Sequence, residues 1–547
     1  MRPTLTCSAS VLLTSWAATG AAPTVQRTAT YNDFVSFFAE WRAFQKPRLV
    51  NGVPDYTSKA MATQQTQLAS YRKRLAAFDP HSWSVAQQVD FHIVRAEMNG
   101  LDYDHRVLKP WARNPAFYVS VVADESDQPA REGPFAFGTV ELWRWQFPLT
   151  EQRARDLAAQ LAPVPALLQQ ARRNLTGDAR DLWVYGIRSL KAQRAVLAEL
   201  TSKAGPHQAL AAAVQRALDA TDGFIRWLEE QAPSKKGRSG VGIENYNWYL
   251  ANVQLLPYTW ADEMAVCQRE LARAKASLAI EEQKNRSLPP QNPINSAEEF
   301  GVRGTAAVTE YMAFLEQHQV LTIRSDMEPA LRAHLGQYTA ARPLEFFTEV
   351  DFRDLALMRT HGYHWFDLAR MQHEPHPSPV RRGALLYNIF NTRTEGFATA
   401  MEELMMHSGL CDARPRSREL VYILLAQRAA RAIGELRVQA NQLSLEEAAA
   451  FASANTPRGW LRLEGHTVWG EQHLYLQQPG YGTSYVIGKI EIDKLLAERA
   501  RQLGGEFTLR RFMDEKDAVG LIPVSLLRWE LTGESRDVPG VAQPMRQ

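Results

Sequence analysis

The residues with the clearest potential for chemistry lie between Thr360 and Glu403. His361 and His364 are three residues apart, and Glu395 follows near the beginning of a second helix-like segment. Residues three apart share one face of a helix, so both imidazoles can point to one place. A glutamate from a following helix would complete a ligand set typical of catalytic zinc sites. The usual H-E-x-x-H motif is absent, so the alternative is that both histidines are hydrogen-bonded residues of the core or its rim.

Further polar side chains could act at the same place. Glu402 lies two helical turns after Glu395 and on the same face, and we expect it to serve as the general base. Tyr485 follows the Pro479–Gly480 turn, and a tyrosine hydroxyl beside a metal can donate a hydrogen bond to a developing oxyanion. The alternatives are a glutamate favoured by the helix dipole and a tyrosine buried under a tight loop.

Basic and aromatic residues nearby are candidates for binding a substrate. Arg428 lies in QRAARAIGELR, and an arginine in a cleft can bind a carboxylate through two hydrogen bonds. Arg431 and Glu435 are also spaced as an ordinary surface ion pair on a helix, so that interpretation stays open. The predicted substrate-binding residues are Tyr363, Arg428, Arg431 and Lys489.

Helices are expected to position all of these residues. Apolar side chains recur at spacings of three and four in many segments, which is typical of amphipathic helices. The predicted helical segments are 61–76, 84–100, 151–172, 179–203, 208–231, 262–284, 297–318, 395–409, 417–440 and 445–453. Strand signals are few and short, at 117–122, 467–476 and 507–509. The sequence therefore predicts an all-α, two-lobed helical body with a central cleft and at most a small β-element.

Breaks in the helical pattern suggest how the chain is organised. The Gly-, Ser- and Lys-rich stretch 232–242 is predicted to link an N-terminal half, 27–231, to a C-terminal half, 243–531. Residues 532–547 are expected to form a flexible tail. A short apolar stretch followed by small residues predicts a secretory signal over 1–22, so the protein is expected to be exported to the periplasm or secreted.

Composition excludes several classes of partner. The 547 residues are 45% hydrophobic and 22% charged, as in ordinary soluble proteins. With 62 basic and 60 acidic residues, the formal net charge is only +2, so nucleic acid is not an expected partner. No long apolar run after the N-terminus predicts a transmembrane helix. Cys267 and Cys411 could form one disulfide or stay free.

Three segments resemble motifs of a known family, the bacterial "domain of unknown function 885". EGFATAMEELMMHSGL is similar to the family pattern E-G-W-A-x-Y-A-E-x-L and places Glu395 at the ligand position. QPGYGTSYVIGK is similar to P-G-Q-A-x-x-Y-x-I-G and places Tyr485 on the patterned tyrosine. RAARAIGELR resembles the arginine-bearing helix of the family. The resemblance covers most of the chain and implies a helical protein similar to the gluzincin metallopeptidases.

The chain departs from the family pattern where the chemistry would be. The family typically has H-E-x-x-P-G-H-H before the glutamate helix, and matching its glycine to Gly362 aligns Leu357–His364 with this motif. Leu357 then replaces the first histidine, Met358 the catalytic glutamate and Tyr363 the next histidine. Losing a positioned base commonly costs about two to four orders of magnitude in rate.

Three hypotheses follow. The first is an exported, metallopeptidase-like hydrolase of a peptide or small amide substrate, with an altered zinc site formed by His361, His364 and Glu395. Because loss of ligands usually abolishes metal binding, the alternative is an inactive pseudopeptidase that binds peptides or small ligands in the inherited cleft. The third is a metal-free enzyme that uses His361, His364 and Tyr363.

Overall fold

The computed structural model describes residues 29–538 and residue 541. Over this range the fold is all-α, and the only sheets are two short pairs of strands. The predicted signal over 1–22 lies outside the described residues, as do 539–540 and 542–547 of the predicted tail. Among the described helices, none combines the length and the apolar character needed to cross a bilayer.

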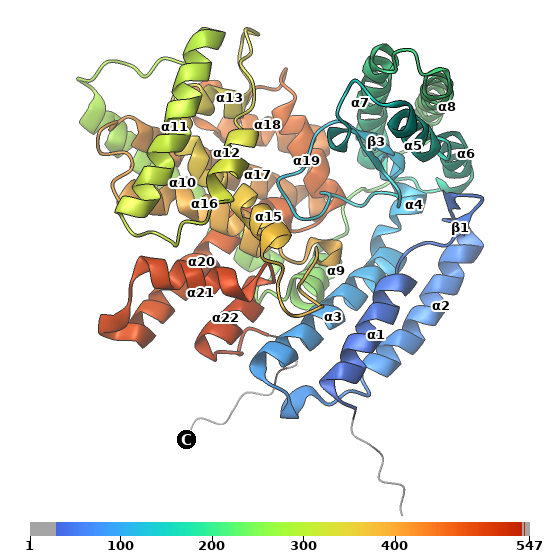
Figure 1. The fold of residues 1–547 in the computed structure, drawn as a ribbon, viewed down its shortest axis with the longest axis horizontal. Coiled ribbons are helices and arrows are strands. Elements are labelled where there is room, and N and C mark those ends of the chain that lie inside the picture. The colour runs from blue at the N-terminus through green and yellow to red at the C-terminus, as the bar shows by residue number, and fades with distance from the viewer. Residues whose placement is uncertain (1–28, 539–540, 542–547) are drawn as a thin grey trace, which may run out of the picture.

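The N-terminal part contains two groups of helices, which Figure 1 shows in blue and in blue-green. The first group comprises α1 (Tyr31–Phe44), α2 (Ser58–Leu75) and α3 (Val85–Tyr103), with the hairpin of β1 (Leu49–Val50) and β2 (Val53–Pro54). The second group comprises α5 (Glu151–Leu161), α6 (Val164–Asn174), α7 (Arg180–Lys203) and α8 (Gln208–Gln231). Between the groups lie α4 (Pro110–Arg113) and the parallel strands β3 (Val121–Val122) and β4 (Val140–Glu141).

The remaining helices form the larger body, drawn from green to red in Figure 1. Its elements are α9 (Ile243–Tyr249), α10 (Trp260–Asn285), α11 (Ala297–Gln317), α12 (Met327–Ala333), α13 (Phe346–Asp351), α14 (Leu355–His361), α15 (Tyr363–His373), α16 (Asn391–His407), α17 (Ser417–Gln439), α18 (Leu445–Asn455), α19 (Thr467–Gln477), α20 (Tyr481–Leu503), α21 (Leu509–Val519) and α22 (Val524–Thr532). α16 and α17 are buried on nearly every side. They therefore form the centre around which the other helices pack.

The predicted helices are confirmed, with one division. Segment 151–172 is two helices, because Pro163 cannot continue the hydrogen-bonding ladder of α5 and instead precedes α6. Capping boxes begin several helices, including the one at Ser444, whose side chain and Glu447 satisfy each other's backbone amides.

Two of the three predicted strands are wrong. Residues 467–476 lie within α19, in which the buried residues Val468, Gln472 and Leu476 recur every four positions along one helix face. Residues 507–509 contain no strand, and Leu509 begins α21. In 117–122, only Val121 and Val122 form a strand. The aromatic and β-branched residues that suggested strands here serve helix packing, because burial decides their conformation more than intrinsic preference does.

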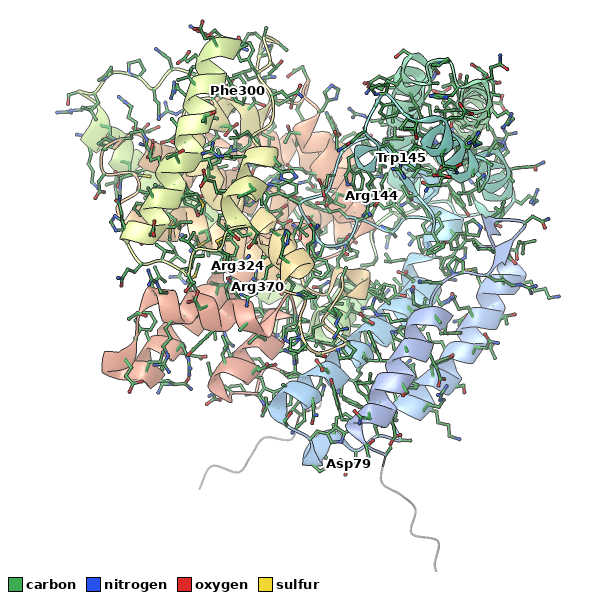
Figure 2. All side chains as sticks on the ribbon, viewed as in Figure 1. Asp79, Arg144, Trp145, Phe300, Arg324 and Arg370 are labelled. Atoms are coloured by element: carbon green, nitrogen blue, oxygen red, sulfur yellow. The ribbon has the colours of Figure 1, made fainter. Side chains whose placement is uncertain are left out.

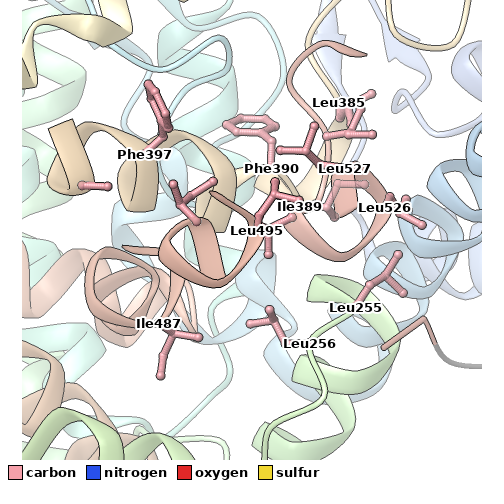
Figure 3. Close-up of a cluster of buried hydrophobic side chains, with 14 of the residues drawn as sticks. Leu255, Leu256, Leu385, Ile389, Phe390, Phe397, Ile487, Leu495, Leu526 and Leu527 are labelled. Carbon is pink, nitrogen blue, oxygen red and sulfur yellow. The ribbon is translucent and has the colours of Figure 1, made fainter. Parts of the chain in front are cut away.

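Hydrophobic packing divides the chain differently from the predicted halves. The largest core joins α1 and α3 to the C-terminal body, including the cluster around Phe390, Leu495 and Leu526 in Figure 3. A second core lies within α5–α8 and includes Trp145. Phe300 belongs to another small core under α11, and Figure 2 shows it far across the molecule from Trp145. The first three helices thus share a core with the C-terminal body.

The predicted linker 232–242 is an ordered connection. The amide of Gly237 donates to the carbonyl of Asp178 at 2.7 Å, and the amide of Gly242 donates to the carbonyl of Gln439 at 2.8 Å. The chain is therefore held to α7 on one side and to the end of α17 on the other. Cys267 and Cys411 are both buried and free, so no disulfide joins them.

Candidate metal centre

The two histidines lie on either side of a helix break, and not on a single helix as their spacing suggested. α14 ends at His361, Gly362 follows, and α15 begins at Tyr363. His364 therefore lies in the first turn of α15. The break still brings the two imidazole rings together, with 5.1 Å between their centroids.

A close crossing of α16 and α20 presents the glutamate. A Cβ atom on Gly488 would lie 2.2 Å from the carbonyl oxygen of Thr392, and one on Gly396 would lie 2.3 Å from the backbone of Gly488. Only glycine at both positions allows this approach. Glu395 of α16 and Tyr481 of α20 consequently meet, and the Tyr481 hydroxyl donates to Glu395 Oε1 at 2.5 Å.

The three predicted ligands do converge. One ligand atom each from His361, His364 and Glu395 lies within 4.8 Å of the others. His364 Nε2 and Glu395 Oε2 are 3.4 Å apart, and each side chain is only 2% exposed. Neither of these two buried atoms has a hydrogen-bond partner. Because buried polar atoms are nearly always satisfied, this pair calls for an explanation.

A loop from the N-terminal part closes over the centre. Gln128 Nε2 donates to Glu395 Oε1 at 2.9 Å and lies 3.3 Å from His364 Nδ1. Glu132 Oε1 also lies 2.5 Å from the Tyr481 hydroxyl, whose single proton is shared between Glu132 and Glu395. Asp127, Glu132 and Glu395 also offer carboxylate oxygens within 4.8 Å of one another. Three residues of this one loop therefore complete the polar lining.

Electrostatics fix the charge states around the centre. Burial disfavours the imidazolium of His364, but Asp127 and Glu395 outweigh it and raise the pKa of His364 to about 9. Burial also works against the carboxylate of Glu395, yet its neighbours, chiefly His364, lower its pKa to about 2. Burial and Asp127 together raise the pKa of Glu132 to about 7. Without a metal, His364 and Glu395 thus form an ion pair, and a metal would have to displace the proton of His364.

Glu402 lies behind His361 and does not have a free carboxylate. Arg428 donates to both of its oxygens, at 2.6 and 2.7 Å, and all of these atoms are buried. Glu402 Oε1 also lies 3.1 Å from Nδ1 of His361. A carboxylate that holds the second nitrogen of a ligating histidine orients the ring. The geometry of Glu402 fits this orienting role better than the predicted role of general base. Because Glu402 occupies the guanidinium of Arg428, this arginine is not free to bind substrate as predicted.

Tyr485 and Arg431 lie on the same side of the site. The Arg431 guanidinium is 5.2 Å from the centre of the Tyr485 ring and forms an ion pair with Glu471. The Tyr485 ring meets that of Tyr481 edge-on, with centroids 6.0 Å apart. Within the described residues, the hydroxyl of Tyr485 makes no hydrogen bond, so it remains available for a ligand.

Two predicted substrate-binding residues lie elsewhere. The hydroxyl of Tyr363 donates to Asp517 at 2.6 Å, and the ring is 1% exposed in the core. Lys489 pairs with Glu403 at 2.9 Å and with Asp493 at 2.7 Å, in a different pocket across α16. Neither side chain points to the centre, so both predictions need correction. Lys489 lies four residues after Tyr485 on α20, but its side chain contacts Glu403 and Asp493.

The residues of the covering loop and Tyr481 were not predicted from the sequence. Asp127, Gln128 and Glu132 lie in a polar stretch without periodicity, more than 200 residues from their partners. Nothing local distinguishes such residues from those of an ordinary surface loop. Tyr481 carried a usable signal, because it lies four residues before Tyr485 in the same glycine-rich motif.

The fold has solved relatives, and a family model covers the chain. A structure from Shewanella oneidensis, described as "a putative lipoprotein of unknown function", has a TM-score of 0.67 and 16% identity over 92% of this chain and 100% of that one. A second, "the putative lipoprotein from Colwellia psychrerythraea", has a TM-score of 0.59 and 14% identity over 92% and 99%. No curated protein matches. The model described as "Bacterial protein of unknown function (DUF885)" matches residues 48–363 and 362–531, and the chain therefore belongs to this family.

Proposed function

We propose that the protein is a metal-dependent hydrolase of peptide or amide bonds, with His361, His364 and Glu395 as the ligands of a zinc ion. The observation that carries this proposal is the buried pair of His364 Nε2 and Glu395 Oε2, 3.4 Å apart and both without hydrogen bonds. Two ligand atoms of a tetrahedral zinc ion, each about 2.0–2.2 Å from the metal, lie about 3.4 Å apart. The donor set of two imidazoles and one carboxylate therefore suits zinc.

Three protein ligands would leave one coordination position open, as in catalytic zinc sites. A zinc ion in such a site lowers the pKa of its water and polarises a carbonyl group. Around it, Glu402 and Arg428 would hold His361 in place. Gln128 would hold Glu395 from the other side.

The chain supplies two further groups for the reaction. We assign proton transfer to Glu132, in place of Glu402, because the Tyr481 hydroxyl links its carboxylate to Glu395 and Arg428 does not occupy it. Tyr485 keeps the predicted role of donating to the developing oxyanion, since its hydroxyl is free. Arg431, beside the Tyr485 ring, is buried and paired with Glu471, so the proposal gives it no contact with the substrate.

The test combines metal content with hydrolysis. Purified protein, Glu395→Ala and the control Glu403→Ala would be analysed for zinc and assayed with a library of internally quenched peptides. Wild type and the control should retain zinc and cleave the same peptides, whereas Glu395→Ala should lose both properties. A zinc-loaded wild type that cleaves nothing in the library would overturn the hydrolase proposal.

A second candidate is a peptide-binding protein without turnover. One observation favours it: Leu357, which replaces the first histidine of the family motif, is 0% exposed in a hydrophobic core, and Met358 packs against that core. No rearrangement of these residues would restore the usual base. Peptides from the same library that bind in equilibrium dialysis but remain intact would support this candidate.

We also infer that the protein lies in the cell envelope or beyond it. The segment expected to be a secretory signal and the description of both similar structures as lipoproteins support this location.

A further inference from the structure

A large cavity lies where the N-terminal part meets the C-terminal body, and residues 130–131 and 133–139, in and after the loop that covers the centre, form part of its wall. Its volume is about 550 Å³, which is within the usual range for a small-molecule site. Aromatic rings from separate segments form much of its wall: those of Tyr56, Trp111, Phe117, Phe135, Tyr249 and Tyr387. A cavity of this size with aromatic rings on several sides is suited to hold an apolar body.

The backbone around this cavity has several unusual conformations. Tyr387 has a left-handed backbone with a φ of 57°, and its ring lies against Gly100 of α3. A Cβ atom at Gly100 would be 2.4 Å from that ring, so glycine is required for Tyr387 to take its place. Asp104 begins a π-helical turn, η2 (Asp104–Leu108), and Tyr249 directly precedes another, η6 (Leu250–Gln254). Such turns are rare and concentrate at functional sites.

One carboxylate in the cavity has no partner. Among the described residues, no donor reaches the Asp104 side chain and no ion pair includes it. Burial raises the pKa of Asp104 to about 7, and no basic group offsets this effect. Asp104 lines the same cavity as Tyr56, Tyr249 and Tyr387. It also raises the pKa values of these tyrosines, after the larger effect of burial.

The other charged residues of the wall are Arg131 and Glu141, and neither pairs with Asp104. Arg131 lies over the Phe135 ring at 4.6 Å, and Glu132, Glu141 and other acids surround it. Glu141 is paired with Arg144 at 2.6 Å. The cavity thus contains one carboxyl group, that of Asp104, without a partner among the described residues, in a wall that also carries aromatic rings. Aromatic faces attract cations, and a buried carboxylate gains most from a cationic partner.

We propose that this cavity is a binding site for an organic cation, a primary or quaternary amine on an apolar body, with Asp104 as the counter-ion and the tyrosines as its cage. The site goes beyond the proposed hydrolase activity and does not depend on it. Its ligand class follows from the unpaired charge and the aromatic wall alone.

Isothermal titration calorimetry of the full chain with three matched probes tests the proposal. The probes are 2-phenylethylamine, the neutral 2-phenylethanol and the anionic 3-phenylpropanoate. The amine should bind at least about tenfold more tightly than the alcohol, because only the amine pairs with the buried carboxylate. The acid should give no binding. Equal affinity for amine and alcohol, or no binding of the amine at millimolar concentration, would overturn the proposal.

Variants assign the preference to a residue. Asp104→Asn should remove the preference for the amine and leave binding of the alcohol unchanged. The control Glu141→Gln, at the same wall but already paired with Arg144, should bind the amine within about twofold of wild type. An equal loss in both variants, or no loss in Asp104→Asn, would contradict the assignment. If Asp104→Asn does not fold, the comparison of probes on wild type still decides.

A last control separates this site from the metal centre. Glu395→Ala should bind 2-phenylethylamine as wild type does, even if it has lost zinc and hydrolysis. If the hydrolase proposal fails, the proposal of an amine site is therefore unaffected. If the amine does not bind, the hydrolase proposal is likewise unaffected.

Discussion

Glu402 and Glu403 are neighbours in the sequence and have opposite surroundings. Glu402 faces His361 and Arg428, whereas Glu403 pairs with Arg273 at 2.8 Å and with Lys489 at 2.9 Å on the other side of α16. If His361 is a metal ligand, only the first of these carboxylates can affect the metal. The pair is therefore a natural test with a built-in control.

Glu402→Gln is expected to weaken zinc binding by about ten- to a hundredfold, the usual cost of losing the residue that orients a ligating histidine. The measurement is zinc affinity by competition with a chromophoric chelator. Glu403→Gln should leave that affinity unchanged, although it breaks two ion pairs. Unchanged affinity in Glu402→Gln, with the fold intact, would show that Glu402 does not orient a ligand.

Among the elements, the crossing of α16 and α20 decides whether the site can form. Glu435 of α17 adds to it by accepting the amides of Gly480 at 2.5 Å and Thr483 at 2.9 Å, which satisfies the beginning of α20. Burial, followed by Glu263, raises the pKa of Glu435 well above its usual value. Three helices are thus fixed to one another directly beside Tyr481.

Gly488→Ala is expected to lower the free energy of unfolding by at least about 2 kcal/mol, because its methyl group would overlap the backbone of α16. Urea unfolding followed by circular dichroism measures the change. Gly470→Ala is the control, since Gly470 is exposed in α19 and nothing lies within 4 Å of an added Cβ. That substitution should stabilise the protein by about 0.5–1 kcal/mol. Similar effects of the two would mean that the crossing is not tightly packed.

Helices were predictable from the sequence where an apolar stripe repeats over many residues, as in α8. Prediction failed in short elements, because 467–476 has the composition of a strand but the contacts of a helix. It also failed at the break between His361 and His364, although Gly362, the C-cap residue of α14, is of the type that most often ends a helix. A short segment's sequence indicates only its intrinsic preference for helix or strand. Packing against distant elements decides which conformation such a segment takes.

Across the whole molecule, the candidate site joins segments that are far apart in the chain. The ligands were predictable because they lie in motifs within 35 residues of one another. Gln128 and Glu132 were not, since only the packing of the N-terminal loop onto α16 and α20 brings them to the centre. Arg428 was predicted in the right region but with the wrong partner, because a spacing cannot show which carboxylate a buried arginine meets.

Buried histidines should make the stability of the molecule depend on pH. Burial, with a contribution from Arg188, lowers the pKa of His473 to about 3, against about 6.5 in an unfolded chain. The unfolded state therefore binds the proton first as pH falls, and the stability present above pH 6.5 is lost below it. Between pH 7 and pH 5 this one group should cost about 2 kcal/mol.

Urea unfolding of wild type and His473→Gln at both pH values isolates this contribution. The loss of stability on acidification should be about 2 kcal/mol smaller in the variant, because glutamine takes up no proton. Equal losses in both proteins would show that His473 is not held in its neutral form.

The central claim is that His361, His364 and Glu395 bind a metal, and anomalous scattering from a zinc-soaked crystal tests it most directly. Data collected on both sides of the zinc absorption edge should show one strong peak within about 2.2 Å of a ligand atom of each residue. The same peak should be absent from crystals of His364→Ala. Anomalous density that lies elsewhere, or no anomalous peak between these three residues at saturating zinc, would contradict the claim.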